Sequence, residues 1–209
     1  MDKKEIIPLL MIAAMFILAA YYYQQFPEKI PTHWNISGDV DGYSGKWTLF
    51  LFPAITLLMY LLLYFLPELD AFKANVEEFY KRFGFMMKFI FVLFFLTLYL
   101  ATILQVKGVK FNITYFIFPS LAALFLFLGY TLRFIKRNYF IGVRTPWTLS
   151  SDKIWEKTHK LAGKLFIAAG IIMPFGLLFP KQLLWIFFAL IITLLLAPVL
   201  YSLYLFKKK

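Results

Sequence analysis

The polar segment of residues 24–46 holds the side chains best suited to chemistry. His33, Asp39 and Asp41 lie close together in this segment. One imidazole with two carboxylates can bind Zn²⁺ or a similar divalent ion, and an imidazole–carboxylate pair can act as an acid and a base. These three residues are therefore candidates for a metal site or for the active site of a membrane hydrolase.

Two further interpretations fit the same segment. Gly38 and Gly42 stand next to aspartates, a pattern typical of turns, while its aromatic residues are typical of anchors at lipid headgroups. The second interpretation is a binding surface for an external ligand. That surface would consist of His33, Trp34, Asn35, Gly38, Asp39, Asp41, Tyr43 and Lys46.

A second polar segment, residues 133–160, is basic. Ser151 and Asp152 offer the N-cap chemistry that starts a helix, and this helix should continue into the next apolar run. We expect the segment either to dock a cytosolic protein or to anchor at the interface by binding anionic lipid. A docking face would use Asn138, Arg144, Thr145, Trp147, Trp155 and His159. His159, a lone histidine, is interpreted as a structural residue rather than a metal ligand.

Six apolar runs must position these two segments. Apolar residues make up 62% of the 209 residues and charged residues 16%, whereas soluble domains average about 45–50% and about 25%. Each run is close to the roughly 20 residues that cross a bilayer as a helix. The runs are residues 6–23, 47–66, 85–104, 112–132, 161–179 and 183–206. The first is read as an uncleaved span. The sequence predicts an all-α polytopic membrane protein with a six-helix transmembrane bundle.

The distribution of Lys and Arg predicts the orientation. If both termini are cytoplasmic, all but five of the 22 Lys and Arg residues lie in cytoplasmic segments, as the positive-inside rule requires. The 24–46 segment is then outside the cell membrane and the 133–160 segment inside. The net charge of +11 is explained by anionic headgroups, so direct nucleic-acid binding is not expected.

Two regions are expected along the chain. Residues 1–66 form a two-helix unit with the outer loop, and residues 67–209 form a four-helix region with the basic inner loop. A smaller inner loop of mixed charge, residues 67–84, is expected to be partly helical. The other connections are short, which predicts antiparallel pairs between the third and fourth spans and between the fifth and sixth.

The apolar runs lack the groups that membrane chemistry needs. Asp, Glu, Arg and His are absent from the middle of every run, and the chain has no Cys. Proton relays and ion pathways depend on buried ionisable groups, so a small-solute transporter is disfavoured. No cofactor is expected, and a divalent metal in the 24–46 segment is the alternative.

Both polar segments resemble a known family. The first motif resembles the small uncharacterised domain that precedes the SdpI region in SdpI-type proteins; it is Phe26-Pro27, Ile30-Pro31-Thr32-His33-Trp34-Asn35, Gly38 and Asp41-Gly42-Tyr43. The second resembles the SdpI signature itself; it is Asn138-Tyr139, Gly142-Val143-Arg144-Thr145-Pro146-Trp147-Thr148-Leu149, Trp155, Lys157-Thr158-His159 and Gly163. Their order and the six spans fit the family over nearly the whole chain.

The resemblance implies a function that composition alone does not give. The best-known member of the SdpI family is an immunity protein that protects a cell from a secreted peptide toxin and also acts as a receptor that holds a cytosolic transcriptional repressor at the membrane; many homologues have no assigned task. The outer loop would face the toxin and the inner loop the repressor. The rival hypothesis is an integral membrane enzyme that uses His33, Asp39 and Asp41.

Overall fold

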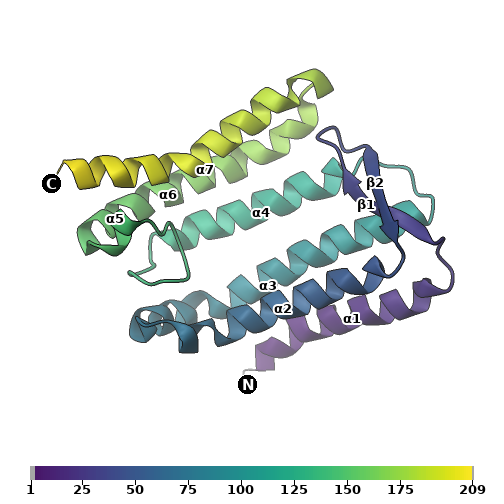
Figure 1. Ribbon diagram of the computed structural model, residues 1–209, viewed down its shortest axis with the longest axis horizontal. Coiled ribbons are helices and arrows are strands. Elements are labelled where there is room, and N and C mark those ends of the chain that lie inside the picture. The colour runs from purple at the N-terminus through teal and green to yellow at the C-terminus, as the bar shows by residue number, and fades with distance from the viewer. Residues whose placement is uncertain (1–2, 209) are drawn as a thin grey trace.

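Six long helices make up most of residues 3–208, the part of the chain that the computed structural model describes (Figure 1). The long helices are α1 (Ile6–Tyr23), α2 (Thr48–Leu69), α3 (Lys73–Val106), α4 (Thr114–Leu132), α6 (Asp152–Ile172) and α7 (Leu184–Lys207). The short elements are η1 (Lys3–Glu5), β1 (Lys29–Trp34), β2 (Val40–Gly45), α5 (Pro146–Leu149), η2 (Met173–Leu178) and η3 (Lys181–Leu183).

Each long helix is long and apolar enough to cross a membrane. Large apolar side chains such as Ile17, Leu58 and Trp185 point away from the bundle and are more than half exposed. Such a surface is costly in water but matches the hydrocarbon core of a bilayer. The predicted six-helix transmembrane bundle is therefore confirmed.

The chain alternates between two ends of the bundle. The β-hairpin lies at one end, and the N- and C-terminal ends of the chain lie at the other (Figure 1); we call these the hairpin end and the termini end. Residues 70–72 and 133–151 connect helices at the termini end. Residues 107–113 and 179–183 connect them at the hairpin end. The side of the membrane that each end faces stays a prediction from the charge distribution.

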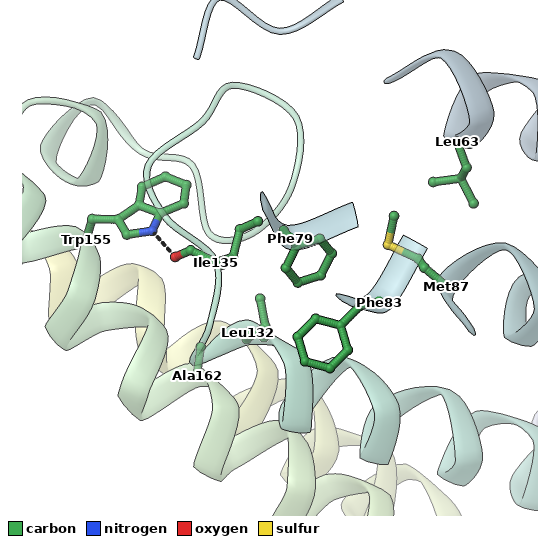
Figure 2. Close-up of a cluster of buried hydrophobic side chains, with 8 residues drawn as sticks. All are labelled: Leu63, Phe79, Phe83, Met87, Leu132, Ile135, Trp155 and Ala162. Carbon is green, nitrogen blue, oxygen red and sulfur yellow. Dashed lines mark hydrogen bonds between the residues drawn. The ribbon is translucent and has the colours of Figure 1, made fainter. Parts of the chain in front are cut away.

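Separate clusters of buried side chains hold the helices together. One joins α1, α2 and α3 and includes Met15 and Tyr99; another joins α4, α6 and α7 and includes Phe118 and Phe187. A third, at the termini end, connects the two groups of helices. Figure 2 shows its buried members, Leu63, Phe79, Phe83, Met87, Leu132, Ile135, Trp155 and Ala162.

Helices α4 and α6 approach closely because glycines line their contact. A Cβ atom placed on Gly163 would lie 2.8 Å from the carbonyl oxygen of Gly129, and one on Gly170 would lie 3.0 Å from that of Ala122. Small residues let transmembrane helices pack backbone against backbone. The predicted pairs α3–α4 and α6–α7 are in contact, but the α4–α6 contact, between two consecutive spans that a long connection joins, was not predicted.

The inner segment at residues 67–84 is helical as expected, but its helical part is larger than the sequence indicated and only residues 70–72 form the connection. Helix α2 continues to Leu69 and α3 already begins at Lys73. Asp70 is buried in the connection, where Oδ1 accepts a hydrogen bond from the Phe72 N–H (2.7 Å) and Oδ2 accepts one from the Tyr139 N–H (2.8 Å). The polar first part of α3 lacks the apolar pattern of a span, so hydropathy did not reveal that the helix is continuous.

The outer loop forms a β-hairpin rather than a series of turns. Strands β1 and β2 are antiparallel, with Ile30 opposite Ser44 and Pro31 opposite Tyr43. The register shifts between Pro31 and Trp34, which is typical of a β-bulge. Ile30 is buried under the hairpin in the cluster of α1, α2 and α3. The hairpin is thereby fixed to the bundle by its apolar underside.

Candidate functional site

Asn35 and Gly38 fix the tip of the hairpin. The Asn35 Oδ1 atom accepts hydrogen bonds from the backbone N–H groups of Ser37 (2.9 Å) and Asp39 (3.0 Å). Gly38 has a φ of +79°, a left-handed conformation that favours glycine. The turn predicted around Gly38 is confirmed, and Asn35 serves it as a scaffold residue.

His33 and Asp41 form an exposed pair across the two strands. Their Nδ1 and Oδ1 atoms are 2.6 Å apart, and the side chains are 73% and 43% exposed. A pair this exposed adds only about 0–1 kcal/mol to stability. Tyr43, on the same face of β2 as Asp41, is also exposed. These three side chains are therefore free to contact a ligand.

Asp39 does not join His33 and Asp41. Its carboxylate lies 2.9 Å from the ammonium group of Lys181, in the connection between α6 and α7. Among residues 3–208 no group of three or more His, Cys, Asp or Glu side chains is placed to hold a metal ion. The three side chains that the sequence suggested as one site therefore do not come together. Of these three, only the His33 imidazole and the Asp41 carboxylate form a pair at the surface.

Three contacts clamp the hairpin onto the rest of the hairpin end. The Trp34 indole N–H donates to Gln105 Oε1 at the end of α3 (2.8 Å). The Asn112 side chain donates to the Ser37 carbonyl oxygen (2.7 Å). Lys46 lies 2.9 Å from Glu28 and covers the ring of Tyr23. Of the predicted ligand surface, Trp34, Asn35 and Lys46 thus hold the hairpin in position.

A hollow of about 540 Å³ separates the hairpin from the connection between α3 and α4. It is lined by Pro31, Gly38, Asp39, Val40, Tyr43, Gln105, Gly108, Val109, Lys110, Phe111 and Asn112. Residues 107–112 were missed as candidates because their only sequence signal is a short run with a glycine and two lysines. The hollow is large enough to accept part of a ligand that has both polar and apolar groups, next to the exposed Tyr43.

At the termini end, Asn138 organises the 133–151 connection from inside. Its side chain is fully buried and donates to the carbonyl oxygens of Lys136 and Ile141. Its Oδ1 atom accepts hydrogen bonds from the N–H groups of Phe140 and Ile141. The predicted docking residue Asn138 therefore has its hydrogen-bonding groups used within the connection.

Thr145 begins the short helix α5 and ties it to α7. The hydroxyl of Thr145 accepts from the Thr148 N–H (3.1 Å), and the Thr148 hydroxyl accepts from the Thr145 N–H (2.9 Å). This reciprocal arrangement is a capping box. The Thr145 hydroxyl also lies 3.1 Å from that of Ser202 in α7. Thr145 is buried and acts in this fold as a structural residue.

Trp155 and His159 lock the first turns of α6 to the connection. The Trp155 indole N–H donates to the Ile135 carbonyl oxygen at 2.8 Å (Figure 2), and the two rings stack with centroids 4.0 Å apart. The Val143 N–H donates to His159 Nε2 (3.0 Å). Because Nε2 accepts, Nδ1 carries the proton and donates to the Trp155 carbonyl oxygen (2.8 Å). The helix predicted to start at residue 152 is confirmed. The rings of Trp155 and His159, which belong to this helix, are both buried in the protein.

The accessible part of the predicted docking face is small. Arg144 is exposed and donates to the Tyr139 carbonyl oxygen (2.7 Å), and Trp147 is partly exposed. Arg82 and Arg133 stack on the ring of Phe134 near the same end. The accessible members of the predicted docking face and these neighbours are therefore arginines and aromatic rings.

One buried ion pair was missed entirely. The Lys88 ammonium group in α3 lies 2.5 Å from the Glu5 carboxylate, and the Tyr60 hydroxyl donates to the same carboxylate (2.9 Å). Both charged side chains are 7% exposed. The sequence places Lys88 among the cytoplasmic flanking cations, because nothing local indicates a partner so distant in the chain.

Comparisons with known proteins separate two regions of the chain. Residues 135–202 match the SdpI/YfhL protein family, and residues 10–57 match a domain of unknown function, DUF1648. The first match covers most of the 133–151 connection, all of α6 and most of α7, and the second covers the hairpin with parts of α1 and α2.

A curated relative resembles the chain over nearly its whole length. The immunity protein SdpI of Bacillus subtilis (strain 168) is 27% identical over 201 residues, which are 96% of this chain and 93% of that protein. No solved structure matches the chain.

Proposed function

We propose that the chain, whose residues 135–202 match the SdpI/YfhL protein family, is a multi-pass membrane immunity protein that protects its cell from a secreted peptide toxin. The observation that carries this proposal is the similarity to the immunity protein SdpI along nearly the full length of both chains. The hairpin and the 133–151 connection both fall within the matched length.

We place the toxin-binding surface on the hairpin. The excess of Lys and Arg at the termini end supports an orientation with both termini in the cytoplasm and the hairpin outside. His33, Asp41 and Tyr43 are exposed there on a scaffold that the Trp34 and Asn112 contacts hold rigid. Preorganised polar and aromatic groups of this kind suit recognition of a peptide.

Immunity should depend on the exposed face of the hairpin. The protein is produced in a toxin-sensitive strain, which is then exposed to the family's peptide toxin. Cells with the triple variant H33A/D41A/Y43A are expected to survive at least about tenfold less well than cells with the unaltered protein, since hot-spot contacts are worth about 1–2 kcal/mol each. Survival is measured by colony counts, with the amount of protein in the membrane fraction determined for each strain.

The control for this experiment is K136A/E78A, which removes an exposed ion pair at the termini end and should leave immunity unchanged. Unaltered survival of the hairpin variant, at equal amounts in the membrane, would contradict the toxin-binding role of the hairpin.

We further propose that the termini end holds a cytosolic transcriptional repressor. The support is a surface of exposed cations and rings around Arg144, Trp147 and Arg133 on a rigid, internally hydrogen-bonded connection. Arginines and aromatic residues are the side chains that most often dominate protein interfaces.

The repressor role gives a separate prediction for Arg144. R144A should reduce co-purification of a DNA-binding repressor at least about tenfold, as expected for a central interface arginine, while K81A, an exposed lysine at the same end, should not. The recovered partner is identified and quantified by mass spectrometry after toxin treatment. Equal recovery with both variants would rule out Arg144 as a docking residue.

A further inference from the structure

A groove between the start of α6 and the end of α7 is lined by three lysines and two apolar residues. Its volume is about 260 Å³. The lining residues are Lys153, Ile154, Lys157, Leu205 and Lys208. Figure 1 shows the end of α7 beside the start of α6 at the termini end. The groove thus combines three ammonium groups with an apolar floor.

The lysines of the groove differ from three paired lysines at the same end. Three others form ion pairs with glutamates at 2.5 Å: Lys73, Lys136 and Lys160. Lys153 and Lys157 form no ion pair within the described chain, although Lys157 interacts electrostatically with the neighbouring Glu156, and Lys208 donates to the hydroxyl of Tyr204 (3.2 Å) rather than to a carboxylate. Three ammonium groups in one groove that form no ion pair favour an anionic ligand.

The helix geometry extends this positive charge toward the lipid. Lys153 and Lys157 are one turn apart on α6, and Lys164, also exposed, follows two turns later on the same face. Lysine stems can lie along apolar surface while their ammonium groups reach the headgroup layer. The groove lies where two candidate membrane spans end, the level at which headgroup phosphates are expected.

We propose that this groove binds the headgroup of an anionic phospholipid. The phosphate lies among the ammonium groups of Lys153, Lys157 and Lys208. The lipid's glycerol and upper acyl chains cover Ile154 and Leu205. A lipid uses both the charge and the apolar floor of the groove, whereas a small free anion uses only the charge. The ligand is therefore a lipid and not free phosphate.

Lipid binding can be counted on the full-length protein. The protein in neutral detergent is titrated with phosphatidylglycerol or phosphatidylcholine, and bound lipid is measured by native mass spectrometry. We expect phosphatidylglycerol to bind the wild type more tightly. We expect K153Q/K157Q/K208Q to bind it about 100-fold more weakly, because each lysine near an anionic headgroup is worth about 1 kcal/mol.

The matched control K73Q/K136Q/K160Q removes the same charge from the same end and should change the affinity less than about threefold, since those charges are already paired. Equal losses in both variants overturn the proposal, as does equal binding of phosphatidylcholine. Glycerol 3-phosphate that competes as well as whole lipid would assign the groove to a free anion instead.

A measurement on the unaltered protein covers the case in which the groove variant does not fold. Photoactivatable phosphatidylglycerol is cross-linked to the wild type, and the adducts are mapped by peptide mass spectrometry. Adducts are expected on the peptides that contain Ile154 and Leu205. Adducts spread over all exposed apolar surfaces, without enrichment there, contradict the proposed site.

Discussion

Replacing Lys88 by methionine is expected to lower the free energy of unfolding by about 3–5 kcal/mol, the usual cost of removing one partner from a buried ion pair. The Glu5 carboxylate would keep its hydrogen bond from Tyr60 but lose the ammonium group 2.5 Å away. At 7% exposure, water cannot replace that partner well. The measurement is unfolding of the detergent-solubilised protein in a titration with sodium dodecyl sulfate.

A second variant separates the charge effect from the loss of the lysine side chain. E5Q/K88M leaves no charge buried, and the glutamine amide can still accept from the Tyr60 hydroxyl, so most of the lost stability should return. K73M is the control, because it removes a lysine from an exposed pair with Glu68 and should cost less than about 1 kcal/mol. If K88M and K73M destabilise the protein equally, the Glu5–Lys88 pair is not a buried contact between helices.

Replacing Gly163 by leucine should be about as damaging, for a steric reason. The first carbon of the new side chain would lie 2.8 Å from the Gly129 carbonyl oxygen, and a backbone atom cannot move aside as a side chain can. Overpacking typically costs about 1–3 kcal/mol, and the rest of a leucine side chain should bring the loss to about 3 kcal/mol or more by separating α4 from α6. G163A should lie in the lower part of this range.

The stability of these variants can be compared by the yield of monodisperse protein and by the midpoint of thermal unfolding in detergent. A189L is the control, because Ala189 is exposed on α7 and an added side chain there meets lipid. Leucine should be tolerated at 189 with a change below about 0.5 kcal/mol. A folded G163L with the thermal midpoint of the wild type would show that α4 and α6 can separate without cost.

The helices could be predicted because their signals are local. Length and hydropathy mark each span, and the N-cap residues before Asp152 mark a helix that begins outside the apolar run. The contact of α4 with α6 could not be predicted, since the sequence does not indicate that Gly129 of one helix faces Gly163 of the other. The Glu5–Lys88 pair was missed for the same reason: its two members lie 83 positions apart.

The candidate sites were predicted less completely than the fold. Around the hairpin, His33, Asp41 and Tyr43 are exposed as a ligand surface requires. Asp39 instead forms an ion pair with Lys181, a contact that no pattern in the sequence indicates. At the other end, residue type alone does not distinguish a buried scaffold from a docking face. Asn138, Thr145, Trp155 and His159 all have side chains that suit either role, and only burial assigns them to the scaffold.

The clamped hairpin has a consequence for how such chains can be recombined. Asp39 and Ser37 belong to the region that matches DUF1648, but their partners are Lys181, in the SdpI-matching region, and Asn112, between the two. A chimera that joins the first region of one homologue to the second region of another would pair residue 39 with a residue 181 that was not selected to fit it, and would place the residue 37 carbonyl beside a different connection. The two regions are separate units of similarity but not modules that exchange freely.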